Sequence, residues 1–320
     1  MTVDDIKKVA CSGAGVIGSS FAAHFALKGF PVNVYEINEG AMENAKVAVN
    51  AILDNLAAED VITAEQKAEI QGRIHYTTDP AEAFGDVQFI QENGPEKIEI
   101  KHAIVKNLDT YAPADCIIAS STSGKKISEI TEFSTHPERY VGAHPFNPPH
   151  LIPLVEMTKS EKTDPQVVET AVAFYKKVDK EPVVLKKEKL GFIANRLAHA
   201  VWREEMALIM EGVCTLEECD TAMCFGPGLR YAVYGPGMIY ELSGKEGLAG
   251  AGAKFSELTG AVFSDLSKMD AVPDGWTEVS VAQIKDEIAN MPEFKGKTRE
   301  ELERFRDHAL IDLLKLHHKL

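Results

Sequence analysis

The sequence is short of positive charge. Its 320 residues hold 34 Lys and Arg against 49 Asp and Glu, which gives a net charge of −15 at pH 7. So acidic a chain is poorly suited to bind the phosphate backbone of nucleic acids or an anionic membrane surface. It can still bind a single anion through backbone dipoles, because these need no lysine. We therefore expect neither a nucleic acid nor a membrane among its partners.

Cysteines and long hydrophobic runs are also scarce. The five cysteines are an odd, widely spaced set, which predicts no disulfide framework. Three of them recur every five residues, at Cys214, Cys219 and Cys224, a spacing that scatters the thiols around a helix and is unlike that of zinc sites. No stretch approaches the roughly 18 apolar residues of a membrane-spanning helix, and residues 1–8 lack the basic start of a secretion signal. These absences predict a cytoplasmic protein without a bound metal.

The first half of the chain alternates β-branched runs with helical patterns, as parallel βαβ units do. Eight strands are predicted, at residues 8–10, 32–37, 73–76, 87–91, 116–119, 140–144, 152–157 and 182–185. This pattern predicts an α/β fold, with a Rossmann-type, doubly wound and mostly parallel sheet over residues 1–187. Residues 39–72 are predicted to form a helical hairpin inserted at the edge of that sheet.

From residue 188 onwards the sequence shows no convincing strand pattern. Apolar residues at helical spacing predict one long helix from about residue 190 to 210. Further helical stretches follow at residues 216–224, 237–242, 247–263, 281–290 and 299–319. We therefore predict an all-helical C-terminal domain over residues 188–320 that serves substrate binding and dimerisation, because an apolar helical stripe without a sheet to cover commonly pairs with a second copy.

A glycine-rich turn, Gly13-Ala14-Gly15-Val16-Ile17-Gly18, follows the first predicted strand. Gly13 permits the tight turn, and Gly15 lets backbone amides approach a pyrophosphate. Gly18 allows the next helix to pack closely on the strand. Val16 and Ile17 open that helix, whose N-terminus supplies partial positive charge. The turn predicts a dinucleotide-binding site.

The second predicted strand ends near Glu36, 18 residues beyond Gly18. A carboxylate at this position can accept hydrogen bonds from the ribose diol of an adenosine. A 2′-phosphate would meet this carboxylate with no arginine nearby, so the cofactor expected is NAD and not NADP. Methyltransferases and flavoproteins share such turns, which leaves the reaction open at this point.

Reactive side chains follow the later strands. Ser123 ends the segment Ser120-Ser121-Thr122-Ser123, and His144 precedes a loop rich in proline. Ligands of open α/β sheets lie outside the carboxyl ends of the parallel strands, which favours a site that contains Ser123 and His144. Glu156, in the next strand, could bind the other ring nitrogen of His144 and stabilise its cation, as a general base requires.

With these residues the sequence resembles the L-3-hydroxyacyl-CoA dehydrogenase family over nearly its whole length. Five motifs in the family's order carry the resemblance. They are the glycine turn, the SxTS segment that ends at Ser123, the HxFNP loop that begins at His144, Glu156 twelve residues later, and the GFxxNR segment that contains Asn195.

The resemblance implies an NAD-dependent dehydrogenase in which His144 and Glu156 form the catalytic dyad. His144 would take the proton of a 3-hydroxyl while the hydride leaves to NAD, and Ser123 and Asn195 would hold the substrate at the reacting centre. Taken alone, each residue also has a structural interpretation, such as a surface amide for Asn195, and only the joint order favours a site. The family pattern implies a homodimer as well. It places four side chains beside the nicotinamide half of the cofactor: Glu96, Lys101, Ser123 and Asn147.

Two departures from the acyl-CoA enzymes bear on the substrate. Family members use lysines of the hairpin to meet the phosphates of coenzyme A, whereas residues 39–72 here hold two lysines against seven acidic residues. The second departure is the GLRYA segment around Arg230, which with the SSTS and HPFNPPHLIPLVE segments is most similar to L-gulonate 3-dehydrogenase (lambda-crystallin) and more distantly to carnitine 3-dehydrogenase. The planar fork of Arg230 suits a free carboxylate, a group that a thioester lacks.

We therefore expect the oxidation of a short free L-3-hydroxy acid, similar to L-gulonate, to its 3-keto acid. The first alternative is a short-chain CoA thioester such as 3-hydroxybutyryl-CoA. Carnitine is a further one, since aromatic side chains can enclose its trimethylammonium group. The candidates for such a cage are Trp202, Tyr231, Tyr234 and Tyr240. The last alternative is a non-catalytic, crystallin-like protein that binds NAD.

Overall fold

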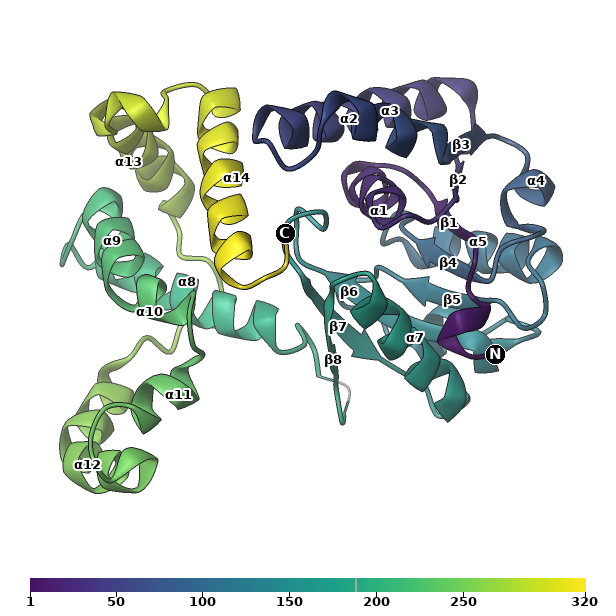
Figure 1. Cartoon of the computed structure of the whole chain (residues 1–320). Coiled ribbons are helices and arrows are strands. Elements are labelled where there is room, and N and C mark those ends of the chain that lie inside the picture. The colour runs from purple at the N-terminus through teal and green to yellow at the C-terminus, as the bar shows by residue number, and fades with distance from the viewer. Residues whose placement is uncertain (188) are drawn as a thin grey trace. The chain divides into compact units, whose positions relative to one another are not determined.

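The computed structural model describes residues 1–187 and 189–320, with residues 251–256 described by their backbone alone. The chain divides into two compact units. The first consists of Met1–Ile193 together with Arg306–Leu320, and the second of Ala194–Phe305. Figure 1 labels their helices and strands.

The first unit is built on one eight-stranded sheet of order β3-β2-β1-β4-β5-β6-β7-β8. Its strands are β1 (Val9–Ser12), β2 (Val32–Tyr35), β3 (Ile74–Thr77), β4 (Phe89–Glu92), β5 (Ile117–Ser120), β6 (Tyr140–Pro145), β7 (Leu154–Thr158) and β8 (Glu181–Val184). All neighbours pair in parallel except β6 and β7, which are antiparallel. The chain starts in the middle of the sheet and winds outwards in both directions, which is the doubly wound arrangement. The predicted fold class and its eight strands are confirmed.

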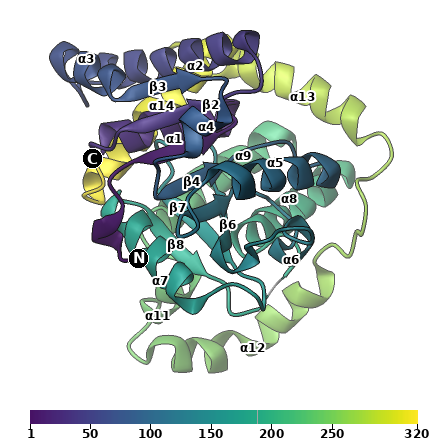
Figure 2. The same cartoon turned by 90° about the vertical axis from the view of Figure 1, so that its right-hand side faces the viewer.

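Helices cover both faces of this sheet (Figures 1 and 2). They are α1 (Val16–Leu27), α2 (Glu39–Ala58), α3 (Ala64–Gly72), α4 (Pro80–Phe84), α5 (Ile98–Tyr111), α6 (Ile127–Ile130) and α7 (Pro165–Lys177), with 3₁₀ turns at Val3–Asp5 and Pro137–Arg139. Successive strand residues alternate between the two layers, because side chains of a strand point to opposite faces. Phe89 and Ile117 belong to the core cluster with α1 and α7, whereas Ile90 and Ile118 belong to the cluster with α4 and α5.

Helices α2 and α3 occupy the segment predicted as a hairpin. Asn38 caps α2 by accepting a hydrogen bond from the Ala41 amide at 2.9 Å. Thr63 and Gln66 form a capping box that starts α3, each side chain bonding the other residue's backbone amide. The chain then enters β3 at the edge of the sheet.

The described residues of the second unit form helices joined by loops, with no strand among them. Its helices are α8 (Ala194–Met210), α9 (Leu216–Met223), α10 (Leu229–Tyr231), α11 (Pro236–Glu241), α12 (Gly247–Asp265), α13 (Trp276–Asn290) and the beginning of α14 (Arg299–Leu316), with a π turn at Cys224–Gly228 and a 3₁₀ turn at Glu293–Lys295. Its core is small and consists of four buried side chains: Met206, Ile209, Leu216 and Trp276. None of the helices in the described part of the chain is long and apolar enough to cross a membrane.

The end of the chain belongs to the first unit. Ile311 and Leu314 on α14 are buried in the large core cluster of the sheet domain. The predicted division at residues 187 and 188 lies a few residues before the break between the compact units, and it leaves this terminal segment with the helical domain. The apolar spacing of α14 shows that one face is buried but not which unit buries it.

Candidate active site

The glycine turn between β1 and α1 has the geometry that an anion site requires. Gly13 has a φ of +84°, in the left-handed region that favours glycine, and its amide donates to the Tyr35 carbonyl at 3.0 Å. A Cβ at Gly18 would lie 1.9 Å from the Gly13 carbonyl oxygen, so only glycine permits this packing of helix against turn. No atom would lie within 4 Å of a Cβ at Gly15, which leaves room in front of the turn. The residues present therefore fit a pyrophosphate at the N-terminus of α1.

Glu36 lies beside this turn. Its carboxylate accepts a hydrogen bond from the Ala14 amide, and its own amide donates to the Thr77 carbonyl at 3.2 Å. The carboxylate is thus held directly after β2, where the ribose of a dinucleotide is expected. Val16 and Ile17 form the first turn of α1, with the Val16 side chain exposed.

His144 and Glu156 face each other across the antiparallel pair of β6 and β7. They are register partners, and His144 Nδ1 lies 3.3 Å from Glu156 Oε2. The second oxygen of Glu156 accepts a hydrogen bond from the Ile193 amide at 2.8 Å. Glu156 is 1% and His144 8% exposed, and the rings of Phe146 and Phe192 lie 5.8 and 5.4 Å from the imidazole. A carboxylate at Nδ1 keeps the proton there, which leaves Nε2 as the basic nitrogen.

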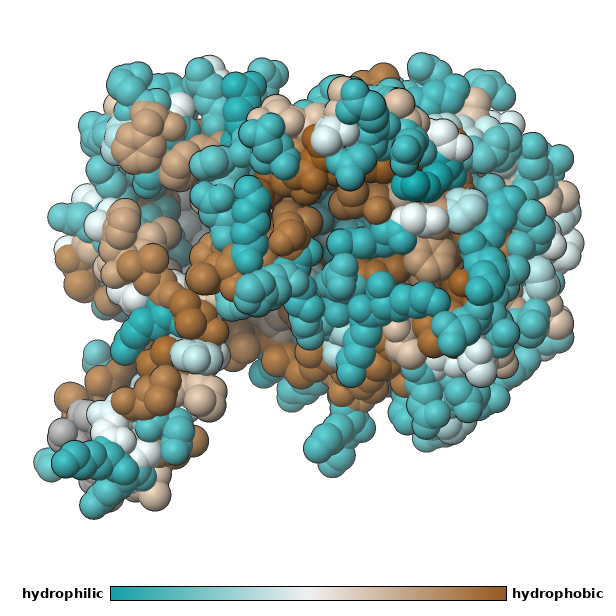
Figure 3. Space-filling view, in the orientation of Figure 1, coloured by the Kyte–Doolittle hydropathy of each residue, from teal (hydrophilic) through white to brown (hydrophobic). Residues whose placement is uncertain are grey.

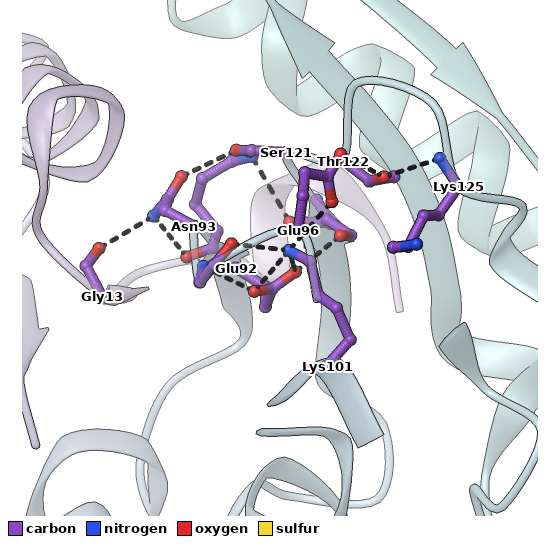
Figure 4. A network of polar contacts seen from close by, with 12 residues as sticks. Gly13, Glu92, Asn93, Glu96, Lys101, Ser121, Thr122 and Lys125 are labelled. Carbon is purple, nitrogen blue, oxygen red and sulfur yellow. Dashed lines mark hydrogen bonds and ion pairs between the residues drawn. The ribbon is translucent and has the colours of Figure 1, made fainter. Parts of the chain in front are cut away.

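Lys101 is held in the interior by a carboxylate that the sequence did not single out. Its ammonium lies 2.7 and 2.9 Å from the two oxygens of Glu92 and donates to the Gly94 carbonyl at 2.9 Å (Figure 4). Glu96 is more distant, at 3.9 Å. Lys101 is only 1% exposed, so this is a buried ion pair and not a surface pair on one helix. A charged residue at the end of the buried strand FIQE was the one available signal for Glu92.

Glu96 organises the segment that follows β5. One of its oxygens accepts hydrogen bonds from the Thr122 hydroxyl at 2.8 Å, the Ser123 amide at 2.5 Å and the Ser123 hydroxyl at 3.0 Å. Partial burial works against the charged carboxylate, but the hydrogen bonds from Ser123 and Thr122 and the Lys101 ammonium outweigh it and lower the pKa of Glu96. The structure thus brings together Glu96, Lys101 and Ser123, three of the four side chains implied for the nicotinamide region.

Asn93 joins the glycine turn to this segment. Its amide nitrogen donates to the carbonyls of Gly13 at 3.2 Å and Gln91 at 2.9 Å, and its oxygen accepts from the Ser121 hydroxyl at 2.7 Å (Figure 4). β4 lies between β1 and β5 in the sheet, so this side chain at the end of β4 reaches both neighbours. Asn93 was not predicted from the sequence either.

Lys180 holds the loop that follows His144 in place. The buried Lys180 ammonium donates to the carbonyls of Pro149 and Ile152, the latter at 3.2 Å. Burial, and to a lesser degree Lys28, lowers the pKa of Lys180 to about 7. In the same loop the amide of His150 donates to the hydroxyl of Ser20 on α1 at 2.7 Å.

Three predicted residues stand apart from these networks. Asn147 is exposed in the loop after β6. Asn195 lies in the first turn of α8 and is half-buried, and Arg230 is exposed on α10. Asn195 and Arg230 belong to the second unit, and their part in the site stays a prediction.

Comparison with known proteins assigns the family. Residues 8–189 match the NAD binding domain of 3-hydroxyacyl-CoA dehydrogenase, and residues 191–265 match its C-terminal domain. The chain belongs to the 3-hydroxyacyl-CoA dehydrogenase family. It is accordingly an oxidoreductase that uses NAD.

Similar proteins from this family include L-carnitine dehydrogenases. That of Streptomyces griseus is 36% identical over 98% of this chain and 90% of its own, and that of Bacillus cereus is 35% identical over 99% and 94%. Among solved structures, 5-formyl-3-hydroxy-2-methylpyridine 4-carboxylic acid 5-dehydrogenase, an NAD⁺-dependent dismutase, has a TM-score of 0.79 and 29% identity over 98% of this chain and 97% of its own. The (S)-3-hydroxybutyryl-CoA dehydrogenase of Ralstonia eutropha has a TM-score of 0.65 and 26% identity over 79% and 88%. The sequence ranked an L-gulonate-like substrate first and carnitine among the alternatives, an order that these relatives do not follow.

Proposed function

We propose that this enzyme oxidises the 3-hydroxyl of a short free L-3-hydroxy acid to the 3-keto acid, and that L-carnitine is the first substrate to test. The buried cross-strand pair of His144 and Glu156 carries the chemical part of the proposal. The L-carnitine dehydrogenases, at 36% and 35% identity over nearly the whole chain, support the substrate class.

The chain's own residues supply the acid-base part of this reaction. Nε2 of His144 takes the proton of the 3-hydroxyl, which leaves the imidazole positively charged. Glu156 stabilises that charge through Nδ1, and the Ile193 amide holds the carboxylate in place. A positioned base of this kind contributes about 10²- to 10⁴-fold to the rate. NAD, when bound, accepts the hydride from the carbon that carries the hydroxyl.

Ser123 is suited to hold the substrate oxygen in the proposed complex. Its hydroxyl and its amide both point to Glu96, so the side chain is oriented before any substrate arrives. Such preorganisation lowers the free-energy cost of alignment at the reacting centre. The family pattern implies Asn195, at the start of α8, as a second residue that holds the substrate.

The hairpin supports a free acid over a CoA thioester. Lys46 pairs with Glu43 at 3.2 Å, and Lys67 pairs with Asp54. Both lysines between residues 39 and 72 are therefore paired with a carboxylate. Five further acidic side chains remain, of which Glu69 is paired with Arg73 and Glu59 with His308, and the excess of negative charge disfavours phosphates. Arg230, exposed on α10, offers the planar fork that a carboxylate requires.

The test is NAD reduction at 340 nm with L-carnitine, L-gulonate, L-3-hydroxybutyrate and 3-hydroxybutyryl-CoA. We expect turnover of the free acids, with L-carnitine the best substrate, and an increase of at least about tenfold in the KM for the free acid in Arg230→Gln. Arg304→Gln, a second exposed arginine of the same unit, is the matched control and should leave KM unchanged. Turnover of the thioester alone would overturn the proposal.

A further inference from the structure

Two neighbouring cavities of the first unit are lined by lysines. The smaller has a volume of about 120 Å³ and lies against Lys125, Lys126, Lys189 and Phe192. The larger has a volume of about 650 Å³ and shares Lys126 with it. Five lysines line the larger cavity: Lys126, Lys159, Lys162, Lys186 and Lys187. The catalytic site described above uses none of these lysines.

The sheet topology brings these lysines together from three separate segments. Thr158 is the register partner of Gly142, and Val184 is that of Met157, so β7 and β8 end side by side next to the start of β6. The turn after β7 is held in place, because the Thr163 hydroxyl donates to the Tyr140 carbonyl at 2.9 Å. The third segment is the loop between β5 and α6. The cavity is thus built on strand ends and not on one flexible loop.

The charge of this cavity is opposite to that of the chain. Among the described residues of its lining, Glu132 and Glu161 are the acidic ones, so that five positive charges against two give +3. In the described part of the chain, no carboxylate forms an ion pair with any of the five ammonium groups. Unpaired like charges around one cavity repel each other until a counter-charge enters. These five lysines lie together although the chain as a whole has a net charge of −15.

We propose that this lysine-lined cavity binds a small ligand with neighbouring phosphate groups, outside the NAD site. Lysine is a compact point charge that binds phosphate without a fixed geometry, and +3 matches a multiply charged anion better than a single carboxylate. A volume of about 650 Å³ lies in the range of small-molecule sites. The acidic surface elsewhere disfavours a long polyanion such as a nucleic acid.

The proposed ligand would lie apart from the cofactor but close to the catalytic pair. The glycine turn follows β1, whereas the cavity lies at the end of the sheet formed by β6, β7 and β8. Lys126 connects the cavity to the smaller one, whose wall includes Phe192. The ring of Phe192 lies 5.4 Å from that of His144. The smaller cavity, which adjoins the proposed site, therefore shares a wall residue with the surroundings of the catalytic histidine.

The test is calorimetric titration of the NAD-saturated enzyme with inorganic tripolyphosphate and, separately, with coenzyme A. We expect one saturable site that weakens with added salt, and a loss of affinity of at least about tenfold in the double variant Lys159→Gln and Lys162→Gln. The matched control replaces Lys106 and Lys176, which are exposed on α5 and α7, by Gln and should bind as the wild type does. All four lysines are exposed, so both variants should keep the wild-type melting temperature.

The two probes distinguish free phosphates from phosphates carried by a coenzyme. If the Lys159 and Lys162 variant loses tripolyphosphate binding, the site is supported and its ligand carries free phosphates. If the variant loses only coenzyme A binding, the site is supported and its ligand is a coenzyme. Absence of saturable binding, an equal loss in the control variant, or displacement of NAD by the probe would overturn the proposal. Turnover of free 3-hydroxy acids is measured without tripolyphosphate or coenzyme A. A failure of this site can therefore be distinguished from a failure of the proposed function.

Discussion

The spacing of twelve residues between His144 and Glu156 is enough to predict that the two side chains meet. Two residues twelve positions apart become direct neighbours when the strands that carry them are antiparallel and joined by a loop of the right length. The side chains of such a pair lie on the same face of the sheet. Another partner of Glu156, the Ile193 amide, comes from further along the chain.

Replacing His144 by Gln tests the base directly. We expect kcat to fall by at least about 100-fold while the Kd for NAD stays near that of the wild type, because His144 is not part of the glycine turn or of Glu36, which we expect to hold the phosphates and the ribose. Steady-state kinetics and NAD titration by intrinsic fluorescence measure the two quantities. Wild-type turnover in this variant would refute the assignment of His144 as the base.

Lys180 predicts a pH dependence of stability. Its pKa is about 7 in the folded protein against 10.5 for an unperturbed lysine, so above pH 7 the unfolded chain holds one more proton than the folded one. The free energy of unfolding should therefore gain about 1.4 kcal/mol per pH unit from this group as the pH rises above 7, and nothing from it well below pH 7. Burial of the charged form thus destabilises the fold at low pH.

Urea unfolding at pH 7.5 and pH 9 measures this effect. Between these two pH values the free energy of unfolding of the wild type should rise by roughly 2 kcal/mol more than that of Lys180→Met, in which the titrating group is absent. The comparison cancels the contributions of other groups, since both proteins share them. Equal gains in the two proteins would show that Lys180 does not titrate in this range.

Two residues of the site, Glu92 and Asn93, could not be predicted from the sequence. They follow each other at the end of β4, and neither belongs to one of the five motifs that carry the family resemblance. Their partners, Lys101 and the Gly13 carbonyl, come from a following helix and a distant turn. Spacing along the chain cannot reveal such contacts, because they depend on which strands are neighbours in the sheet.

At the scale of elements, the turn between β1 and α1 was predicted in most detail. Its glycines have distinct physical reasons, and the structure provides a separate observation for each. The positive φ belongs to Gly13, the close backbone contact to Gly18 and the open space to Gly15. These differences allow cofactor binding to be separated from folding by mutation.

We expect Gly15→Ala and Gly18→Ala to fail in different ways. A methyl group at Gly15 meets no protein atom, so the melting temperature should stay within about 2 °C of the wild type while the Kd for NAD rises at least about tenfold. A methyl group at Gly18 would overlap the Gly13 carbonyl, so this variant should melt several degrees lower as well. Calorimetric melting and NAD titration provide both values. Equal NAD binding by Gly15→Ala and the wild type would contradict the proposed place of the pyrophosphate.

The strands were predictable because each is a short apolar run bounded by turn residues. Their ends shifted by a few residues, since the terminal hydrogen bonds depend on the neighbouring strand. Helix α14 shows the opposite case. Its sequence indicates a helix, yet the burial of Ile311 and Leu314 in the core of the sheet domain follows only from the tertiary structure.

At the scale of the whole molecule, the second unit exposes many large apolar side chains. Figure 3 shows hydrophobic residues at the surface of the segment from α8 to α11. Those exposed on α8 and α11 include Leu197, Val201, Trp202, Met238 and Tyr240. Apolar surface of this extent usually marks an interaction site in a protein. We therefore propose that a second copy of the chain covers it.

Light scattering coupled to size exclusion tests this homodimer. We expect the mass of two 35.0 kDa chains at micromolar concentration. The double variant Leu197→Asp and Val201→Asp should shift the mass towards that of one chain, because two charges would enter an apolar interface. A monomeric mass for the wild type would remove the proposal.

The sequence by itself determined the strands, the glycine turn, the spacing of His144 and Glu156 and the acidic hairpin. Each of these is a local pattern, and the periodicities of strands and helices or the needs of a turn are written in consecutive residues. Only the tertiary structure decided that Glu92 neutralises Lys101, that the last helix returns to the sheet domain and that five lysines surround one cavity. Those contacts join segments far apart in the chain, and the order of the strands in the sheet, not their sequence, sets which of them meet.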